Sequence, residues 1–287
     1  MKLVMFGSSE REAVPGVILG DKIARLEIAE FDYPKSIEEI LEVGLLPEIS
    51  DYIENTPLKN MKTMPLKDAY IAAPLSGIGK VIACGLNYKN HATEMGDALP
   101  LTPLIFAKAN SSIAGANEPL TLPRAEISEQ IDWEIELGVV IGETCKDVST
   151  ENALNYVAGY VIALDITARD IQKQDGQWFR AKSFDGFCPL GEFILTRDEL
   201  DFSEEIELIL SVNGKEKQRG KLNDMIFNVA EIVSFVSASM TLFAGDLLLT
   251  GTPDGIGAGK NPPEFLKSAD IIDAEITNLG KIKIKVK

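Results

Sequence analysis

Residues 84–96, CGLNYKNHATEMG, contain two side chains that could exchange a proton with a substrate. His91 is the only histidine of the 287 residues, and Glu94 follows it three positions later. Histidine changes its charge close to neutral pH, which suits a general base. On a short helix, a carboxylate at i+3 can accept a hydrogen bond from the imidazole and orient it. His91 is therefore either a surface residue without a task or the base of an active site.

The segment IDWEIELGVVIG, residues 131–142, points to a second kind of chemistry. Asp132, Glu134 and Glu136 alternate with apolar residues, which predicts that the three carboxylates share one face of a β-strand. That face is either solvated, or it lines a pocket in which a cation balances the charges. The continuation LGVVIG predicts a strand buried on both faces, and Asp165 ends another strongly apolar run, YVAGYVIALD.

Two glutamates and an aspartate would form an all-oxygen set of metal ligands. Because no histidine or cysteine lies near them in the sequence, the set favours Mg²⁺, Mn²⁺ or Ca²⁺ over Zn²⁺. Three protein ligands would leave roughly three of the six octahedral Mg²⁺ positions for water or substrate, as a catalytic metal requires. A nucleophilic thiol is a weaker alternative, because Cys84 ends an apolar strand and is expected to be packed.

The elements that must position these residues fall into two parts. Residues 1–72 predict a small α/β domain, with strands in MKLVMF and in GVILGDKIARLEI and a helical pattern in SIEEILEVG that is interrupted near Gly44. The Pro-, Ser- and Gly-containing segment IAAPLSGIGK predicts the boundary near residues 70–80. In residues 73–287, strand-like segments outnumber helices and do not alternate with them. We therefore expect a β-rich α+β fold, with a mixed barrel or roll, rather than a doubly wound parallel sheet.

Composition limits the partners. The chain carries 28 Lys and Arg against 44 Asp and Glu, a net charge of −16, which argues against nucleic acid and anionic membranes as partners. An anionic small substrate would need local positive charge at its site. The sequence has no apolar run of 18 residues, no signal-peptide pattern at MKLVMFGSSE and no metal-ligand spacing among its three cysteines. These features predict a cytoplasmic protein with free thiols.

Six motifs occur in order from about residue 80 to the C-terminus, and together they resemble the fumarylacetoacetate hydrolase superfamily. They are GLNYKNHATEMG, DWEIELGVVIG, VAGYVIALDITARDIQ, RAKSFDGFCPLG, NGKEKQRGKLNDMIF and GDLLLTGTPDGIGAG. The segment GAGKNPPEFLKSADII resembles the corresponding segment in a branch of this superfamily that acts on acylpyruvates and diketo sugar acids. The resemblance implies a β-rich barrel or roll, a homodimer and a small extra N-terminal domain.

The resemblance also implies roles for individual residues. Glu134, Glu136 and Asp165 stand where the family binds Mg²⁺ or Mn²⁺, whereas Asp132 matches no ligand position. His91 and Glu94 stand where the family has its water-activating dyad, on a segment that orders as a lid. The positions that hold the 2-oxo acid, the developing oxyanion and a carboxylate match Arg169, Gln172, Lys182 and Thr252. Leu86 stands where some relatives carry an arginine, which leaves the binding of the substrate's distal end open.

The expected activity is hydrolysis of the C–C bond of a 2,4-dioxo acid to pyruvate and a second acid through a metal-bound enolate. An acylpyruvate, fumarylpyruvate or a 2,4-diketo-3-deoxy sugar acid would serve as substrate, with His91 activating water and Lys182 stabilising the oxyanion. One alternative keeps the metal enolate without water attack, as in an oxaloacetate decarboxylase or an isomerase or decarboxylase of 2-hydroxyhepta-2,4-diene-1,7-dioate type. The other is a binding protein without catalysis, which would have no use for His91.

Overall fold

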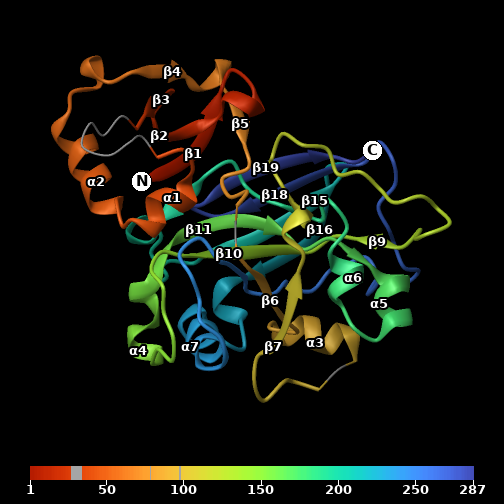
Figure 1. Cartoon of the computed structure of the whole chain (residues 1–287). Helices are drawn as coiled ribbons and strands as arrows, with labels where there is room; N and C mark the ends of the chain where they lie inside the picture. Colours follow the sequence, from red (N-terminus) through yellow and green to blue (C-terminus); the bar gives the residue numbers. More distant parts are fainter. Residues whose placement is uncertain (27–33, 78, 97) are drawn as a thin grey trace.

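The computed structural model describes residues 1–26, 34–77, 79–96 and 98–287 (Figure 1). The end of the strand predicted in GVILGDKIARLEI, residues 27–28, lies outside the described residues. The helices are α1 (Ile37–Glu42), α2 (Leu46–Asn55), α3 (Lys89–Met95), α4 (Thr150–Ala153), α5 (Arg169–Asp175), α6 (Phe179–Lys182) and α7 (Val229–Ser239). The first strands are β1 (Lys2–Gly7), β2 (Val14–Leu19), β3 (Lys22–Arg25), β4 (Thr63–Pro65), β5 (Tyr70–Ala72), β6 (Val81–Gly85), β7 (Leu104–Lys108), β8 (Ile113–Ala114), β9 (Ile131–Asp132) and β10 (Ile135–Ile141). The later strands are β11 (Val157–Leu164), β12 (Thr167–Ala168), β13 (Cys188–Pro189), β14 (Ile194–Thr196), β15 (Glu207–Val212), β16 (Lys215–Lys221), β17 (Leu247–Leu249), β18 (Ile271–Ile276) and β19 (Gly280–Lys285).

A large mixed sheet runs through the molecule. In the described parts of the chain it has eleven strands in the order β4-β3-β2-β1-β14-β11-β10-β17-β6-β7, with β5 paired to β1. Its pairings are antiparallel except for β17 with β6. A separate antiparallel sheet has the order β16-β15-β18-β19. The fold is therefore β-rich α+β, as predicted.

Strands β10 and β11 form the centre of the core, and every residue in both is buried. Side chains alternate along a strand, so the two faces of the sheet meet different partners. On one face Val140 and Val161 share an apolar cluster with Ile37 of α1. On the other face Leu137 shares a cluster with Leu208 of β15, which places the smaller sheet against the larger one. The prediction that LGVVIG is buried on both faces is confirmed.

Local sequence signals explain several connections. Asn213 and Gly214 both have positive φ, 53° and 73°, as a type I′ turn requires between β15 and β16. Asn228 caps α7 because its side chain accepts a hydrogen bond from the Glu231 N–H at 3.0 Å. The Glu231 carboxylate in turn accepts from the Asn228 N–H at 2.7 Å. Gly44 has φ of 72° and separates α1 from α2, as the interrupted helical pattern predicted.

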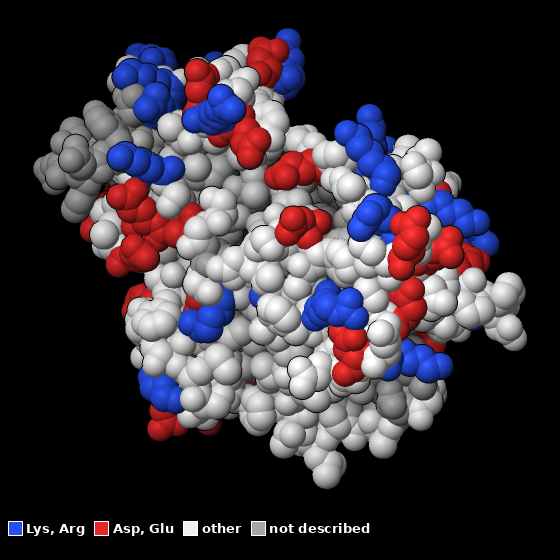
Figure 2. Space-filling view, turned by 45° about the vertical axis from the view of Figure 1, so that its right-hand side comes forward, with Lys and Arg blue, Asp and Glu red and all other residues white. Residues whose placement is uncertain are grey.

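The large sheet stays open where the sequence suggested a barrel or roll. Within the described residues, the strand order runs from β4 to β7 without closing on itself. Strand β1 pairs with β14, so strands of the first 72 residues extend the same sheet as the later ones. The division into domains 1–72 and 73–287 stays a prediction. On the face shown in Figure 2, basic and acidic side chains are interspersed rather than gathered by sign. No helix among the described residues is both long and apolar enough to cross a membrane.

Candidate active site

The pairing of β10 with β11 brings three predicted carboxylates together. In the antiparallel register Ile135 lies opposite Leu164, so Glu134, just before β10, lies opposite Asp165, just after β11. The Asp165 N–H donates to the Glu134 carbonyl at 2.9 Å and continues the ladder. Glu136 is the second residue of β10. One carboxylate oxygen from each of the three residues lies within 4.8 Å of the others.

Burial excludes the solvated-face interpretation of this segment. Asp132, Glu134 and Glu136 are 0%, 4% and 2% exposed. The predicted single strand is also wrong in one respect, because β9 ends at Asp132 and β10 begins at Ile135. This break in the strand separates Asp132 from the two glutamates that lie beside Asp165. Asp132 accepts hydrogen bonds from the Gly257 and Ala258 N–H groups at 2.6 and 3.0 Å, so it holds a loop instead of joining the other two carboxylates.

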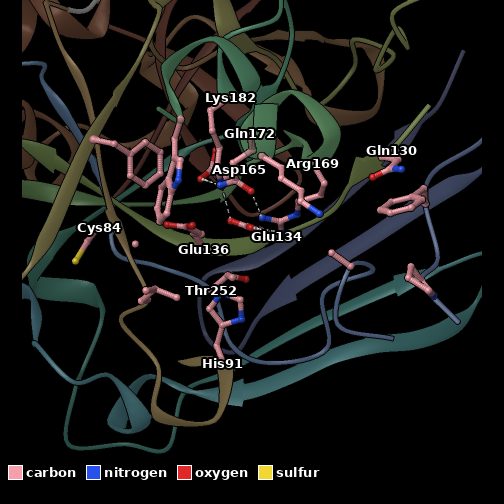
Figure 3. A pocket seen from close by; sticks show the side chains of 18 residues that line it. Cys84, His91, Gln130, Glu134, Glu136, Asp165, Arg169, Gln172, Lys182 and Thr252 are labelled. Carbon is pink, nitrogen blue, oxygen red and sulfur yellow. Dashed lines mark hydrogen bonds and ion pairs between the residues drawn. The ribbon is translucent and has the colours of Figure 1, made fainter. Parts of the chain in front are cut away.

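Two cationic side chains neutralise part of this charge (Figure 3). The Lys182 ammonium lies 2.8 Å from Glu134 Oε2 and 2.5 Å from Asp165 Oδ2. Arg169 donates through Nε to Asp132 at 2.8 Å and through Nη2 to Glu134. Burial alone would raise the pKa of Glu134, but Lys182 and Arg169 outweigh it and lower that pKa to about 2. Burial alone would lower the pKa of Lys182, whereas Asp165 and Glu134 raise it. Both groups are therefore charged at neutral pH.

Glu136 lies in a different environment. Its carboxylate accepts a hydrogen bond from the Gly251 N–H at 2.6 Å, and no described side chain forms an ion pair with it. Burial, together with repulsion from Asp165 and Glu134, raises the pKa of Glu136 well above its usual value. A third carboxylate with uncompensated repulsion is the situation that a bound divalent cation relieves. The residues present therefore fit Mg²⁺ or Mn²⁺, which prefer oxygen ligands.

Helix α3 places His91 and Glu94 beside the carboxylates. His91 is 6% exposed and lines the same cavity as the acidic residues. His91 Nδ1 lies 3.6 Å from Glu94 Oε2, beyond hydrogen-bond distance, and this buried nitrogen has no hydrogen-bond partner among the described residues. Both oxygens of Glu94 instead accept from the Gly255 N–H, at 3.1 and 3.0 Å. The pair predicted from the sequence is adjacent in space, with Glu94 also holding α3 against the 255–259 loop.

The remaining predicted residues also line the cavity. Gln172 accepts a hydrogen bond from Arg169 Nη1 at 3.0 Å, one turn earlier on α5. The Thr252 hydroxyl donates to the Ile135 carbonyl at 2.9 Å and accepts from Gln218 Nε2 at 2.8 Å. This hydroxyl therefore donates its proton into the protein, and its role as a carboxylate-binding group stays a prediction.

The cavity that these side chains line has a volume of about 730 Å³. Figure 3 shows the three carboxylates, Lys182 and Arg169 gathered at its centre, with His91 and Thr252 beside them. Cys84 also lines it, but burial and the charge of Glu136 raise the pKa of its thiol to about 12. The thiol therefore stays protonated and does not suit a nucleophile.

The family model described as fumarylacetoacetate (FAA) hydrolase C-terminal matches residues 80–287. The chain belongs to the fumarylacetoacetate hydrolase superfamily. Over 286 residues it is 41% identical to 2,4-didehydro-3-deoxy-L-rhamnonate hydrolase of Sphingomonas sp. (strain SKA58), covering 98% of this chain and 94% of that protein. Its fold is similar to 5-carboxymethyl-2-hydroxymuconate delta-isomerase from Mycobacterium smegmatis, with a TM-score of 0.78, 32% identity and coverage of 100% and 99% of the two chains. It is also similar to maleylpyruvate hydrolase from Sphingobium sp. SYK-6 in complex with manganese(II) and pyruvate, with a TM-score of 0.79, 26% identity and coverage of 100% and 98%.

Lys108, at the end of β7, also belongs to the site, although the sequence did not point to it. It is 3% exposed, and its ammonium lies 2.7 Å from Asp165 Oδ1. It also donates to the carbonyls of Lys182 and of Phe187, the latter at 3.1 Å. The signal in the sequence was weak, since a lysine after LIFA could equally end an exposed strand. Its position shows that Asp165 is held by two lysines, one on each oxygen.

Proposed function

We propose that this protein hydrolyses the C–C bond of a 2,4-dioxo acid with a divalent cation as cofactor. The observation that carries the proposal is the convergence of three buried carboxylates, Lys182 and His91 in one cavity. A superfamily relative named as a hydrolase of a didehydro-deoxy sugar acid, and another structure holding manganese(II) and pyruvate, support this class of substrate. A binding protein without catalysis would not need a buried histidine facing such a cavity.

In this mechanism the chain supplies a base, a cationic donor and an orienting group. A divalent cation held by Glu134, Glu136 and Asp165 would act as a Lewis acid towards the 2-oxo acid. His91 takes a proton from the water that attacks the C4 carbonyl. Lys182 donates a hydrogen bond to the oxygen that becomes negative at C4, and its raised pKa keeps it charged for that purpose.

The C3–C4 bond then breaks and its electron pair stays on C3, which takes up a proton. The products are pyruvate and the acid derived from the acyl group, so one water is consumed for each substrate. Glu94 holds α3 on the 255–259 loop, and it orients the imidazole when it approaches closer than the present 3.6 Å. These roles account for every residue predicted to be catalytic.

The proposal is tested by measuring pyruvate release from acetylpyruvate, oxaloacetate and a 2,4-diketo-3-deoxy sugar acid, together with isomerisation of 2-hydroxyhepta-2,4-diene-1,7-dioate. The protein is first treated with EDTA and then assayed with and without Mg²⁺ or Mn²⁺. We expect metal-dependent pyruvate and a second acid from the dioxo acids. Turnover of oxaloacetate alone, with release of CO₂, would assign a decarboxylase instead, and isomerisation of a dienedioate without cleavage would assign an isomerase. Absence of turnover on all of them favours a binding protein.

A pair of variants tests the metal site in the same assay. Glu134→Gln removes the charge of a buried carboxylate, whereas Glu143→Gln makes the same change at an exposed position. We expect Glu134→Gln to weaken Mn²⁺ binding in titration calorimetry and Glu143→Gln to leave it unchanged. Equal Mn²⁺ affinity of the two variants would contradict the assignment of Glu134 as a ligand.

A further inference from the structure

We propose that the cavity selects a 2,4-dioxo acid whose acyl group carries no charge, and that Leu86 determines this specificity. The inference rests on the proposed function, and it adds the class of acyl group that the site accepts. The acyl carbonyl must lie beside His91, which activates the water. Leu86 lies on the connection between β6 and α3 that carries His91, and it lines the same cavity. The side chains around the acyl group therefore include Leu86.

The cations of the cavity are already engaged by carboxylates of the protein. Lys182 donates to Glu134 and Asp165, and the proposed mechanism uses its third N–H at the C4 oxygen of the substrate. Arg169 contacts Asp132 and Glu134. Among the described residues that line the cavity, the remaining lysine or arginine is Lys173, which is exposed to solvent, where water screens its charge. A second carboxylate on the substrate would thus enter without a buried cationic partner.

The walls of the cavity suit an uncharged group. The Trp178 ring lies against Gly85, where an added Cβ would come within 2.4 Å of it, and it packs edge-on against Phe106 with ring centroids 5.0 Å apart. The cavity is also lined by the apolar residues Leu86, Ala258, Pro263 and Phe265. Burying an unpaired carboxylate against such surfaces is costly, whereas a methyl or an alkyl group gains from contact with them.

The backbone at Leu86 supports a functional role for its side chain. Leu86 has φ of 54°, in the left-handed region that leucine rarely adopts. The next residue, Asn87, is fully buried and binds the backbone of Phe227 and the carbonyl of Thr250, which holds the connection in place. Strained residues that their surroundings hold in place cluster at functional sites. This local geometry places a leucine, with no hydrogen-bonding atoms in its side chain, at the wall of the cavity.

Two substrates that differ at one position test the proposal. 2,4-Dioxoheptanoate and 2,4-dioxoheptanedioate have the same seven-carbon chain and differ only in a terminal methyl or carboxylate group. We expect the wild-type protein with Mg²⁺ or Mn²⁺ to show a kcat/KM about 100-fold higher for the monoacid, the scale expected when a charged group loses its hydrogen-bonded partners. Equal values, or a preference for the diacid, would overturn the proposal.

Leu86→Arg places a cation in the cavity, and Leu101→Arg adds the same charge at a leucine that is 96% exposed and does not line it. We expect Leu86→Arg to shift the ratio of kcat/KM values towards the diacid by about 10-fold to 100-fold, with Leu101→Arg unchanged. An unshifted ratio in folded Leu86→Arg protein would remove Leu86 from the proposal. If that variant does not fold, the wild-type ratio still decides the class of substrate.

The failure of the proposed function gives a different result from the failure of this inference. If neither of these dioxo acids releases pyruvate with either metal, and acetylpyruvate and the 2,4-diketo-3-deoxy sugar acid do not either, the hydrolase activity itself is refuted. If both are cleaved and the diacid is preferred, the activity stands and the inference about the acyl group is wrong.

Discussion

Replacing Lys108 with methionine removes a buried cation while keeping most of the volume of the side chain. The Lys108 ammonium is fully enclosed and has three acceptors, which are Asp165 Oδ1 at 2.7 Å, the Phe187 carbonyl at 3.1 Å and the Lys182 carbonyl. In Lys108→Met, Asp165 keeps one of its two lysine partners and loses the other. Both carbonyls lose a donor.

The expected loss of stability is large because a buried charge is left partly uncompensated. Removing one partner of a buried ion pair typically costs about 3–5 kcal/mol. Total stabilities of domains are roughly 5–15 kcal/mol, so a substantial fraction is lost. For a chain of this size, about 2 °C of Tm is lost for each kcal/mol, which predicts a decrease of roughly 6–10 °C.

The assay is thermal unfolding followed by circular dichroism, in EDTA, for the wild-type protein and two variants. Lys281→Met is the matched control, because Lys281 forms an ion pair with Glu275 at 2.9 Å but its side chain is 73% exposed. Exposed ion pairs contribute little, so the control should unfold close to the wild-type temperature. The same Tm for Lys108→Met and Lys281→Met would show that the buried pair does not stabilise the fold.

A double variant identifies the interaction responsible. If the Lys108–Asp165 pair causes the loss, Lys108→Met combined with Asp165→Asn should be more stable than the sum of the single effects predicts, because neither partner is left charged and unpaired. Strictly additive effects would refute the reasoning and attribute the cost to the lost carbonyl contacts.

Two further predictions concern the site, and a third concerns the cysteines. His91→Asn should lower kcat by about 10²–10⁴-fold and leave Mn²⁺ affinity unchanged in calorimetry; full activity would exclude His91 as the base. Gly259→Ala should lower kcat/KM at nearly constant Tm, because an added Cβ would lie 2.5 Å from Glu94 Cδ and displace the end of α3; unchanged kinetics would show that this contact is not required. The three cysteines are buried and their pKa values are raised by burial, to about 12 for Cys84 and Cys188, so little thiolate exists at pH 8. They should react with an aromatic disulfide reagent only after unfolding, and rapid reaction of the native protein would contradict this burial.

Much of the fold could be predicted from local patterns. The hairpin at Asn213-Gly214 depends on two neighbouring residues that tolerate positive φ, and α7 depends on its cap at Asn228, so both are visible in the sequence. The segment STENALNYVAG opens with a Ser149 or Thr150 cap and acidic Glu151, which favour a helix. Helix α4 and the 3-10 turn after it follow this preference up to Tyr156, but β11 begins at Val157. There the pairing of β11 with β10 outweighs a local helical preference, which the sequence does not reveal.

The sequence by itself determined which residues could do chemistry. Its only histidine, the alternating carboxylates and the aspartate at the end of an apolar run pointed to a proton-transfer and metal site, and the ordered motifs assigned the family. These conclusions depend on residue type and short spacing, which a sequence contains directly.

The tertiary structure decided how those residues are balanced and held. The register of β10 and β11 sets Glu134 opposite Asp165. Because the strand breaks before β10, Asp132 instead accepts hydrogen bonds from the backbone of residues 257–258. Lys108 lies 57 positions from Asp165 in the chain, yet it holds one of its oxygens. Charge balance in a buried site is a sum over contacts between distant segments, so it could be known only once the chain was folded.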